Sequence, residues 1–310
     1  MNAIEIRNLT KNFGQKQALN GLNMTVPQGA IYGFIGENGS GKSTTEKIIC
    51  GLIHPNGGEV KLFGRDYTDA DVRAKVGVLI EQPGCFPNYS VWNNMMLQAA
   101  NLGIENAEEE VRKVLKVVHM EGSASNKYKN CSLGMKQRIG IAMALLGNPA
   151  LLILDEPING LDADGMRIMR EVLTDVTKNY NCTVVISSHI LGELEKIATH
   201  YGIVRGGKMI AEMTAEELEA DCPTFVALKT KDTDAAYAFL ERKYSRVTFE
   251  NEYIRIYGDV KAEDIVSCLY NELNVIVTEI KTDKISLEEY YINLMNKGVC
   301  LNVKKAEKYA

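Results

Sequence analysis

The chain has 310 residues, of which 45% are hydrophobic and 24% charged, so a large domain plus a smaller one with ordinary apolar cores is expected. Its formal net charge of −5 argues against nucleic acid as the main partner, because a phosphate-binding surface usually carries a basic bias. The seven cysteines lack CxxC spacing and no secretory signal is expected ahead of them, which indicates a reducing, cytoplasmic compartment.

The first third of the chain predicts a series of short strands that leads into a glycine-rich loop. Five runs have the alternating or apolar composition of strands: residues 4–6, 22–26, 31–35, 60–63 and 76–80. The glycine-rich loop follows the third run, and residues 44–50 after it have a helical composition. Residues 91–119 then carry apolar side chains at three- and four-residue spacing, which indicates helix.

The middle of the chain alternates helices with buried strands. Residues 136–146 and 166–179 predict helices, whereas residues 151–154 and 184–186 are wholly apolar, as in strands buried on both faces. This alternation is typical of an α/β layer architecture. The most apolar stretch, residues 139–154, contains a proline and is shorter than the roughly 20 unbroken apolar residues that cross a bilayer. A membrane role is therefore expected to come through a partner.

A change of composition at residues 216–223 predicts a domain boundary, with a first domain of residues 1–218 and an accessory domain of residues 219–310. The elements expected beyond it are strand 225–229, helix 234–242, strands 247–249 and 253–257, helix 262–273, strand 275–280 and helix 287–295. Their order indicates a small α+β, ferredoxin-like appendage with a closing helix. It carries no cluster of chemically active residues, which favours dimer support or regulation, and a charged tail follows residue 303.

Residues 36–43 match the Gly-x4-Gly-Lys-Ser/Thr phosphate loop in full, between an apolar strand and a helix. Its glycines let backbone N–H groups surround phosphates beside a helix N-terminus, where a Cβ would obstruct. Lys42 is expected to reach the β- and γ-phosphates and the Ser43 hydroxyl to ligate Mg²⁺. The expected nucleotide-binding residues here are Gly36, Asn38, Gly39, Gly41, Lys42, Ser43 and Thr44. A chance glycine-rich turn is the alternative, and the strand and helix on either side argue against it.

The apolar strand at residues 151–154 ends in two acids, Asp155 and Glu156. A strand buried on both faces has little reason to end in adjacent carboxylates unless they meet a metal ion or a reacting water. Asp155 is expected to hold the Mg²⁺ shell, and Glu156 to orient and polarise the attacking water. A solvated strand end is the alternative, which the phosphate loop upstream makes the weaker interpretation.

A family resemblance rests on motifs around these two sites. Residues 132–138, Ser-Leu-Gly-Met-Lys-Gln-Arg, resemble the signature motif of ATP-binding-cassette proteins, which also lies upstream of the acidic strand. Residues 159–162 resemble the family's D-loop, His189 its switch histidine, and Phe13 is similar in position to the aromatic residue that stacks on adenine. Taken singly, a structural role for His189 and a core position for Phe13 remain open. The motifs cover residues 1 to about 215.

The resemblance implies a P-loop NTPase fold of the α/β class, with an antiparallel β subdomain and a helical subdomain around residues 88–140. It implies Mg²⁺-dependent ATP hydrolysis in a head-to-tail homodimer or heterodimer. Ser132 and Gly134 would then contact the γ-phosphate held by the opposite subunit, at a helix N-terminus suited to anions. It also implies a separate transmembrane permease, with this chain peripheral on the inner face of the cell membrane.

Two departures from the family pattern narrow the resemblance. Leu133 and Met135 stand where the signature usually has glycine and glutamine. Residues 76–83 align with the Q-loop so that Glu81 replaces its glutamine; a register shift of one would place Gln82 there, but then the following segment aligns with a gap. Glu81 would bring an anion near Mg²⁺ and the attacking water, so we count it as both a catalytic and a metal-site residue.

A glutamate in this loop resembles the E-loop of ATPases from lantibiotic self-protection and bacitracin-resistance transporters. That group also tolerates a Ser-Leu-Gly-Met signature and an added C-terminal domain. The resemblance therefore favours an ATPase that drives expulsion of peptide antibiotics, with residues 86–92 facing a permease helix, although Trp92 could equally be a core residue. The alternatives are a soluble cassette ATPase acting on ribosomes or DNA, the ATPase of a nutrient importer, and a regulatory module without hydrolysis.

Overall fold

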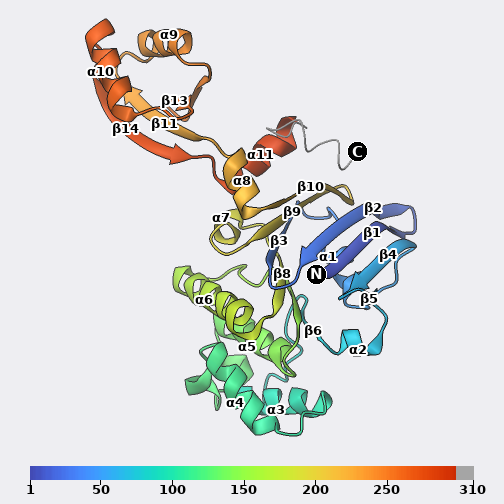
Figure 1. Ribbon diagram of the computed structural model, residues 1–310. Coiled ribbons are helices and arrows are strands. Elements are labelled where there is room, and N and C mark those ends of the chain that lie inside the picture. The colour runs from blue at the N-terminus through green and yellow to red at the C-terminus, as the bar shows by residue number, and fades with distance from the viewer. Residues whose placement is uncertain (298–310) are drawn as a thin grey trace. The chain divides into compact units, whose positions relative to one another are not determined.

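The computed structural model describes residues 1–297. They divide into two compact units, one from Met1 to Ala215 and one from Glu216 onward (Figure 1), and each is described by itself. The boundary expected after residue 218 falls inside helix α8 (Ala215–Asp221). The predicted charged tail after residue 303, and Cys300, lie outside the described residues.

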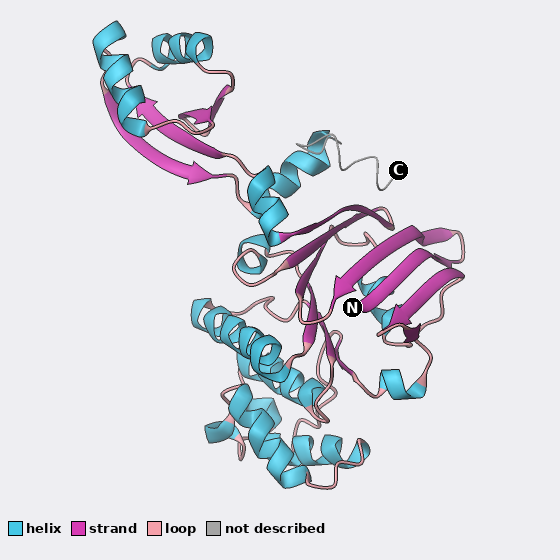
Figure 2. Ribbon diagram, viewed as in Figure 1, coloured by secondary structure: helices cyan, strands magenta, loops and turns pink. Residues whose placement is uncertain are grey.

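A six-stranded sheet forms the centre of the first unit (Figure 2). Its strands, in spatial order, are β10 (Lys208–Thr214), β9 (His200–Arg205), β3 (Ile31–Ile35), β8 (Thr183–Ser187), β7 (Leu151–Asp155) and β6 (Val76–Leu79). All neighbours are parallel except β10 and β9. Every residue of β3 and β8 is buried, as expected for parallel strands covered on both faces. The loops that follow β3, β7 and β8 therefore leave from one edge of the sheet.

Strands β9 and β10 are absent from the sequence-based prediction, and Gly202 is one reason. It interrupts the apolar run of β9, and a Cβ there would lie 2.1 Å from the hydroxyl oxygen of Tyr32. The glycine thus lets Tyr32 of β3 lie across β9, where its hydroxyl donates to Glu212 of β10 at 2.6 Å.

A second, antiparallel sheet has the order β2-β1-β4-β5. Its strands are β1 (Asn2–Phe13), β2 (Lys16–Pro27), β4 (Gly57–Leu62) and β5 (Arg65–Asp66), and α2 (Ala70–Arg73) follows. Buried residues such as Ile4, Leu22 and Val60 pack in one core with Phe34 of the central sheet and Ile48 of α1 (Lys42–Ile49). The antiparallel sheet thereby holds the helix that follows the phosphate loop.

The remaining helices of this unit are α3 (Val91–Asn101), α4 (Ala107–Val117), α5 (Leu133–Leu145), α6 (Ala163–Tyr180) and α7 (Leu191–Leu194), with 3-10 turns at Glu121–Ser123 and Tyr128–Asn130. The helical pattern over residues 91–119 is thus two helices rather than one. Gly103 separates them at φ 68°, a left-handed conformation that glycine adopts readily. Among the residues described, no helix combines the length and apolar character needed to cross a bilayer.

The second unit has the order β11 (Thr224–Thr230), α9 (Thr233–Lys243), β12 (Val247–Glu250), β13 (Tyr253–Tyr257), α10 (Ala262–Leu273), β14 (Val277–Lys284) and α11 (Leu287–Lys297). Its four strands pair antiparallel in the order β12-β13-β11-β14. Val226, Leu228 and Ile256 from the sheet pack against Leu240 of α9 and Leu269 of α10. The β-α-β-β-α-β order with this pairing is the ferredoxin-like arrangement.

Candidate nucleotide site

The loop between β3 and α1 has a backbone that only glycine accommodates at several points. Gly39 and Gly41 have φ values of 81° and 116°. A Cβ on Gly36 would lie 2.5 Å from the carbonyl oxygen of Val204, so this loop runs directly against β9. The loop is therefore held in a shape that turns backbone N–H groups inward, as phosphate binding requires.

Lys42 opens α1 and is 6% exposed, with its Nζ donating to the carbonyl oxygens of Gly36 at 2.6 Å and Glu37 at 3.2 Å. Its ammonium is thus held by two neutral carbonyl oxygens, and charged phosphate oxygens would be stronger acceptors. The Ser40 hydroxyl is buried and has no hydrogen-bond partner among residues 1–297. A buried polar atom without a partner indicates a place for a ligand or water.

The phosphate loop and the two acids of β7 share one cavity of about 200 Å³. It is lined by Asn38, Gly39, Gly41, Lys42, Ser43, Asp155 and Glu156. The Ser43 hydroxyl and the Asp155 carboxylate are hard oxygen donors of the kind that Mg²⁺ prefers. The described residues contain no group of three or more His, Cys, Asp or Glu that could hold a metal, so an ion here would complete its shell with phosphate oxygens and water. The donor set therefore fits Mg²⁺ bound together with a nucleotide.

The end of β7 is fixed by Ser187, the fully buried last residue of β8. Its hydroxyl donates to Asp155 Oδ1 at 2.6 Å and accepts from the Glu156 N–H at 3.2 Å. Glu156 has a φ of 49°, a left-handed conformation that is uncommon for a non-glycine residue and is found at functional sites. Sequence reasoning did not identify Ser187, although a polar residue that closes an apolar strand was available as a signal.

His189 lies beside the second acid. Its Nδ1 is 2.8 Å from Glu156 Oε2, and its backbone N–H donates to the same oxygen at 3.4 Å. One carboxylate oxygen of Glu156 is thereby oriented by His189. The pair has the geometry of a base held by a second polar group, which is the arrangement that activates water in hydrolytic sites.

Glu46 of α1 is a further acid at this edge, and sequence reasoning missed it. It is 0% exposed, and its pKa is raised to about 8, first by burial and then by the nearby charge of Asp155. The Ser187 hydroxyl and the Lys42 ammonium act in the opposite direction and lower that pKa. The available signal was its spacing from Lys42, since residues four apart lie on the same face of a helix.

Glu81 and Phe13 do not line the cavity. Glu81 has φ 66° and a side chain 72% exposed, with Oε1 3.1 Å from Lys47 Nζ on α1. Phe13 is 51% exposed, and Lys11 Nζ lies 5.2 Å from its ring centroid. Thr44 follows Ser43 in α1 and is likewise outside the cavity lining. The roles assigned to these three residues remain predictions.

The signature segment also lies apart from the cavity of its own chain. Ser132 caps α5, and its hydroxyl accepts from the Met135 N–H at 3.3 Å. Gly134 faces Leu161, whose Cδ2 would lie 3.5 Å from a Cβ at position 134, and Leu133 contacts Gly160. The D-loop segment therefore supports the start of α5 within one chain.

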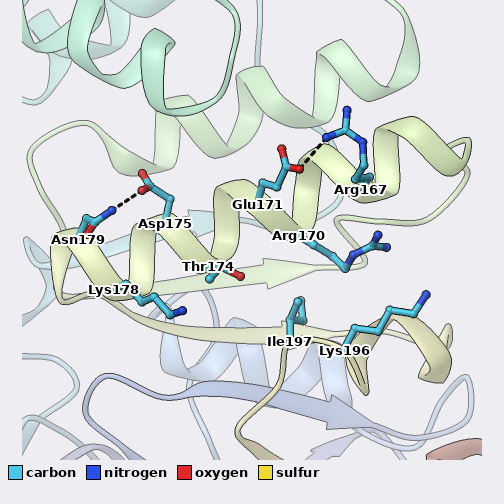
Figure 3. Close-up of a pocket in the computed structure, with 9 residues that line it drawn as sticks. All are labelled: Arg167, Arg170, Glu171, Thr174, Asp175, Lys178, Asn179, Lys196 and Ile197. Atoms are coloured by element: carbon cyan, nitrogen blue, oxygen red, sulfur yellow. Dashed lines mark hydrogen bonds and ion pairs between the residues drawn. The ribbon is translucent and has the colours of Figure 1, made fainter.

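A larger cavity of about 490 Å³ runs along α6 (Figure 3). Three of its cations are matched by acids: Arg167 pairs with Glu171 at 2.6 Å, and both Arg170 and Lys196 pair with Glu193. This cavity is larger, but most of its cations are already paired with acids. The smaller cavity at the sheet edge has the chemically active groups.

The phosphate loop and two adjacent acids thus meet where the parallel strands β3, β7 and β8 end, an arrangement typical of P-loop nucleoside triphosphatases. Comparisons with known proteins identify the family. Residues 19–159 match the model of the ABC transporter family. The bacitracin transport ATP-binding protein BcrA of Bacillus licheniformis is 35% identical over 95% of this chain and 98% of its own length. This chain therefore belongs to the ABC transporter family, as an ATP-binding subunit with ATPase activity.

Other relatives agree. The lantibiotic transport ATP-binding protein SrtF of Streptococcus pyogenes is 41% identical over 67% of this chain and 90% of its own length. A solved ATP-binding subunit of an ABC transporter has a TM-score of 0.63 at 27% identity, covering 70% of this chain and 92% of that one. The dimeric cassette MJ0796 with ADP and phosphate has a TM-score of 0.62 at 25% identity, covering 68% and 98%. The predicted family and fold class are confirmed.

Proposed function

We propose that this chain hydrolyses Mg²⁺-ATP to drive a transporter whose membrane-spanning subunits are separate polypeptides, and that the transported compounds are peptide antibiotics. The observation that carries the catalytic part is the single cavity shared by Lys42, Ser43, Asp155 and Glu156. Support for the substrate class comes from the bacitracin and lantibiotic transport proteins among its relatives. The bacitracin relative matches 95% of the chain, which includes the second unit.

In the proposed reaction the loop N–H groups and Lys42 bind the phosphates, and Lys42 exchanges its carbonyl partners for phosphate oxygens. Ser43 and Asp155 would hold Mg²⁺, which supplies neutralising charge to the phosphate oxygens. Glu156, oriented by His189 at 2.8 Å, polarises the water that attacks the γ-phosphate. Ser187 fixes the Asp155 side chain and the Glu156 backbone through its two hydrogen bonds.

A dimer is the second part of the proposal. Ser132 and the Gly134 N–H stand at the N-terminus of α5, a helix end suited to anions, yet they do not line their own chain's cavity. A second subunit, identical or different, would bring such a helix end to the γ-phosphate. The relative MJ0796 is dimeric in its post-hydrolysis state, which supports this arrangement.

The permease contact belongs to the segment that follows β6. A groove of about 460 Å³ there includes Val78, Pro83 and Leu102. Phe86 and Tyr89, whose rings lie 5.3 Å apart, are 52% and 50% exposed beside it. Aromatic side chains that are exposed together favour a protein partner. We propose that a cytoplasmic helix of the permease binds here, which would place the chain on the inner face of the membrane.

The test is a pull-down of the tagged Glu156→Gln variant from detergent-solubilised host membranes with Mg²⁺-ATP. Co-purification of a multi-span membrane protein in fixed ratio is expected, and cells lacking the ATPase should become more sensitive to bacitracin or lantibiotics. Complementation by the wild type, but not by Glu156→Gln, is the matched control. Recovery of ribosomal material alone would instead favour a soluble cassette ATPase and overturn the transporter proposal.

A further inference from the structure

Strand β14 leaves an unpaired edge on the sheet of the second unit. It ends the strand order β12-β13-β11-β14, and among residues 1–297 its only paired neighbour is β11. β14 has eight residues, whereas β12 at the opposite edge has four. A long edge strand presents a row of backbone N–H and C=O groups that can pair with another strand, and a short edge strand avoids such pairing. Of the two edges, that of β14 is therefore the better suited to an additional strand.

Three exposed apolar side chains occur where α10 leads into β14. Tyr270 and Leu273 of α10 are 57% and 37% exposed, and Ile276, in the connection between α10 and β14, is 68% exposed. Apolar side chains that are exposed together favour a protein partner.

The flank of α10 that carries Tyr270 lies on the side of the β14 edge. α10 packs mainly against β14, whereas α9 packs against β11, β12 and β13 (Figure 1). Sγ of Cys268 lies 2.7 Å from Nζ of Lys243 on α9, so Cys268 marks the flank of α10 that faces α9. Tyr270 is roughly 200° further round the helix at 3.6 residues per turn, and so it lies on the opposite flank. A partner at the β14 edge would therefore also contact α10.

The charges of β14 complement those of a second β14. Glu279 and Lys281 share one face of the sheet, because the Tyr253 hydroxyl donates to Glu279 at 2.6 Å and Lys281 Nζ lies 5.1 Å from the Tyr253 ring centroid. Antiparallel pairing about a two-fold axis at Ile280 opposes Glu279 to Lys281 twice. An axis one residue further along would oppose Lys281 to itself and Glu279 to Asp283. Like charges directly opposite destabilise a sheet, so the axis at Ile280 is favoured.

We propose that the second unit is a homodimerisation module, in which β14 of one chain pairs antiparallel with β14 of a second copy about an axis at Ile280. The sheet then continues across both copies, and the flanks of α10 that carry Tyr270 and Leu273 meet beside the axis. This interface goes beyond the proposed nucleotide-dependent dimer, because it lies wholly within the second unit and requires no ATP. It selects an identical chain as the second subunit.

The test is sedimentation velocity of the purified full chain in EDTA without nucleotide, over a range of micromolar concentrations. Glu279→Lys and Lys281→Glu each oppose like charges across the axis, and the double variant restores opposite charges. Ile276→Lys places a charge in the apolar surface. Phe249→Lys, at a side chain 53% exposed on the other edge strand, β12, is the matched control.

The wild type and Phe249→Lys are expected to dimerise. Each single charge variant and Ile276→Lys should dimerise about tenfold more weakly, and the double charge variant should recover the wild-type affinity. A monomeric wild type, or a double variant as weak as the single ones, would overturn the inference. Glu156→Gln combined with Glu279→Lys should still associate when Mg²⁺-ATP is added. Absence of that association would refute the proposed nucleotide-dependent dimer and leave this interface standing.

Discussion

The nucleotide site of the first unit and the ion-pair network of the second unit treat charge in opposite ways. In the nucleotide site, Lys42 is 6% exposed and forms none of the described ion pairs, and the Glu46 carboxyl is 0% exposed. In the second, Arg255 pairs with Glu289 at 2.6 Å and lies over the Phe225 ring at 4.8 Å. Charges that are buried and unpaired indicate a ligand that completes them, whereas charges already paired indicate a structural role.

Strand direction explains part of this difference. Parallel strands send their following loops to one edge of the sheet, so residues from β3, β7 and β8 converge there. The antiparallel strands of the second unit alternate in direction, and their loops leave from both ends. The first unit is thus built to concentrate polar groups, and the comparison can be tested by substituting matched residues in each.

The largest effect is expected on the ATPase kcat of the Glu156→Gln variant. Loss of the base should reduce kcat by roughly a thousandfold, within the range for general-base catalysis, while ATP affinity is retained. Steady-state ATPase kinetics together with nucleotide binding provide the measurement. Glu289→Gln, which removes the ion pair with Arg255 in the second unit, is the control and should leave kcat within about twofold. Equal losses in the two variants would break the contrast between the units.

Lys42→Ala should come next, with ATP affinity reduced about 100-fold, since hydrogen bonds to charged groups contribute about 1.5–3 kcal/mol each. Its carbonyl partners Gly36 and Glu37 would also lose a donor. Calorimetric titration with ATP measures the change. Lys229→Ala, which removes the pair with Glu252 in the second unit, is the matched control and should bind ATP normally. Wild-type affinity in Lys42→Ala would contradict the assigned phosphate contact.

The same contrast shows how far the sequence alone could predict the site. The phosphate loop and Asp155-Glu156 were found because each is a short local pattern beside an apolar strand. The spacing of Glu46 from Lys42 could have placed it on the same helix face, but its burial depends on how α1 packs against β7, which no local pattern records. The ion pair between Glu81 and Lys47 likewise depends on the left-handed backbone conformation of Glu81, which the sequence does not specify. Strands β9 and β10 were missed because glycines at 202, 206 and 207 interrupt their pattern.

A smaller effect, on stability, is expected to depend on pH at Glu46. Its pKa is raised from 4.5 to about 8 in the folded chain, so the native state keeps a proton that the unfolded state releases. Stability of the first unit should therefore fall as pH rises between these two values. In EDTA, the thermal midpoint of Glu46→Gln should exceed that of wild type by little at pH 5 and by roughly 3–6 °C at pH 8. A difference that does not vary with pH would contradict this account.

The smallest effect is expected in the second unit, for Arg255→Lys. Lysine keeps the charge but loses the planar group that pairs with Glu289 and lies over Phe225, so a loss of about 1 kcal/mol is expected. Hydrogen exchange of the amides of β13 and β11 measures it, with Lys281→Arg, a conservative change at an exposed side chain, as the control. ATP affinity and kcat should stay unchanged, because Arg255 belongs to a network whose charges are already satisfied. A shift in either would mean that the second unit regulates hydrolysis through this ion pair, and the paired charges would then be functional as well as structural.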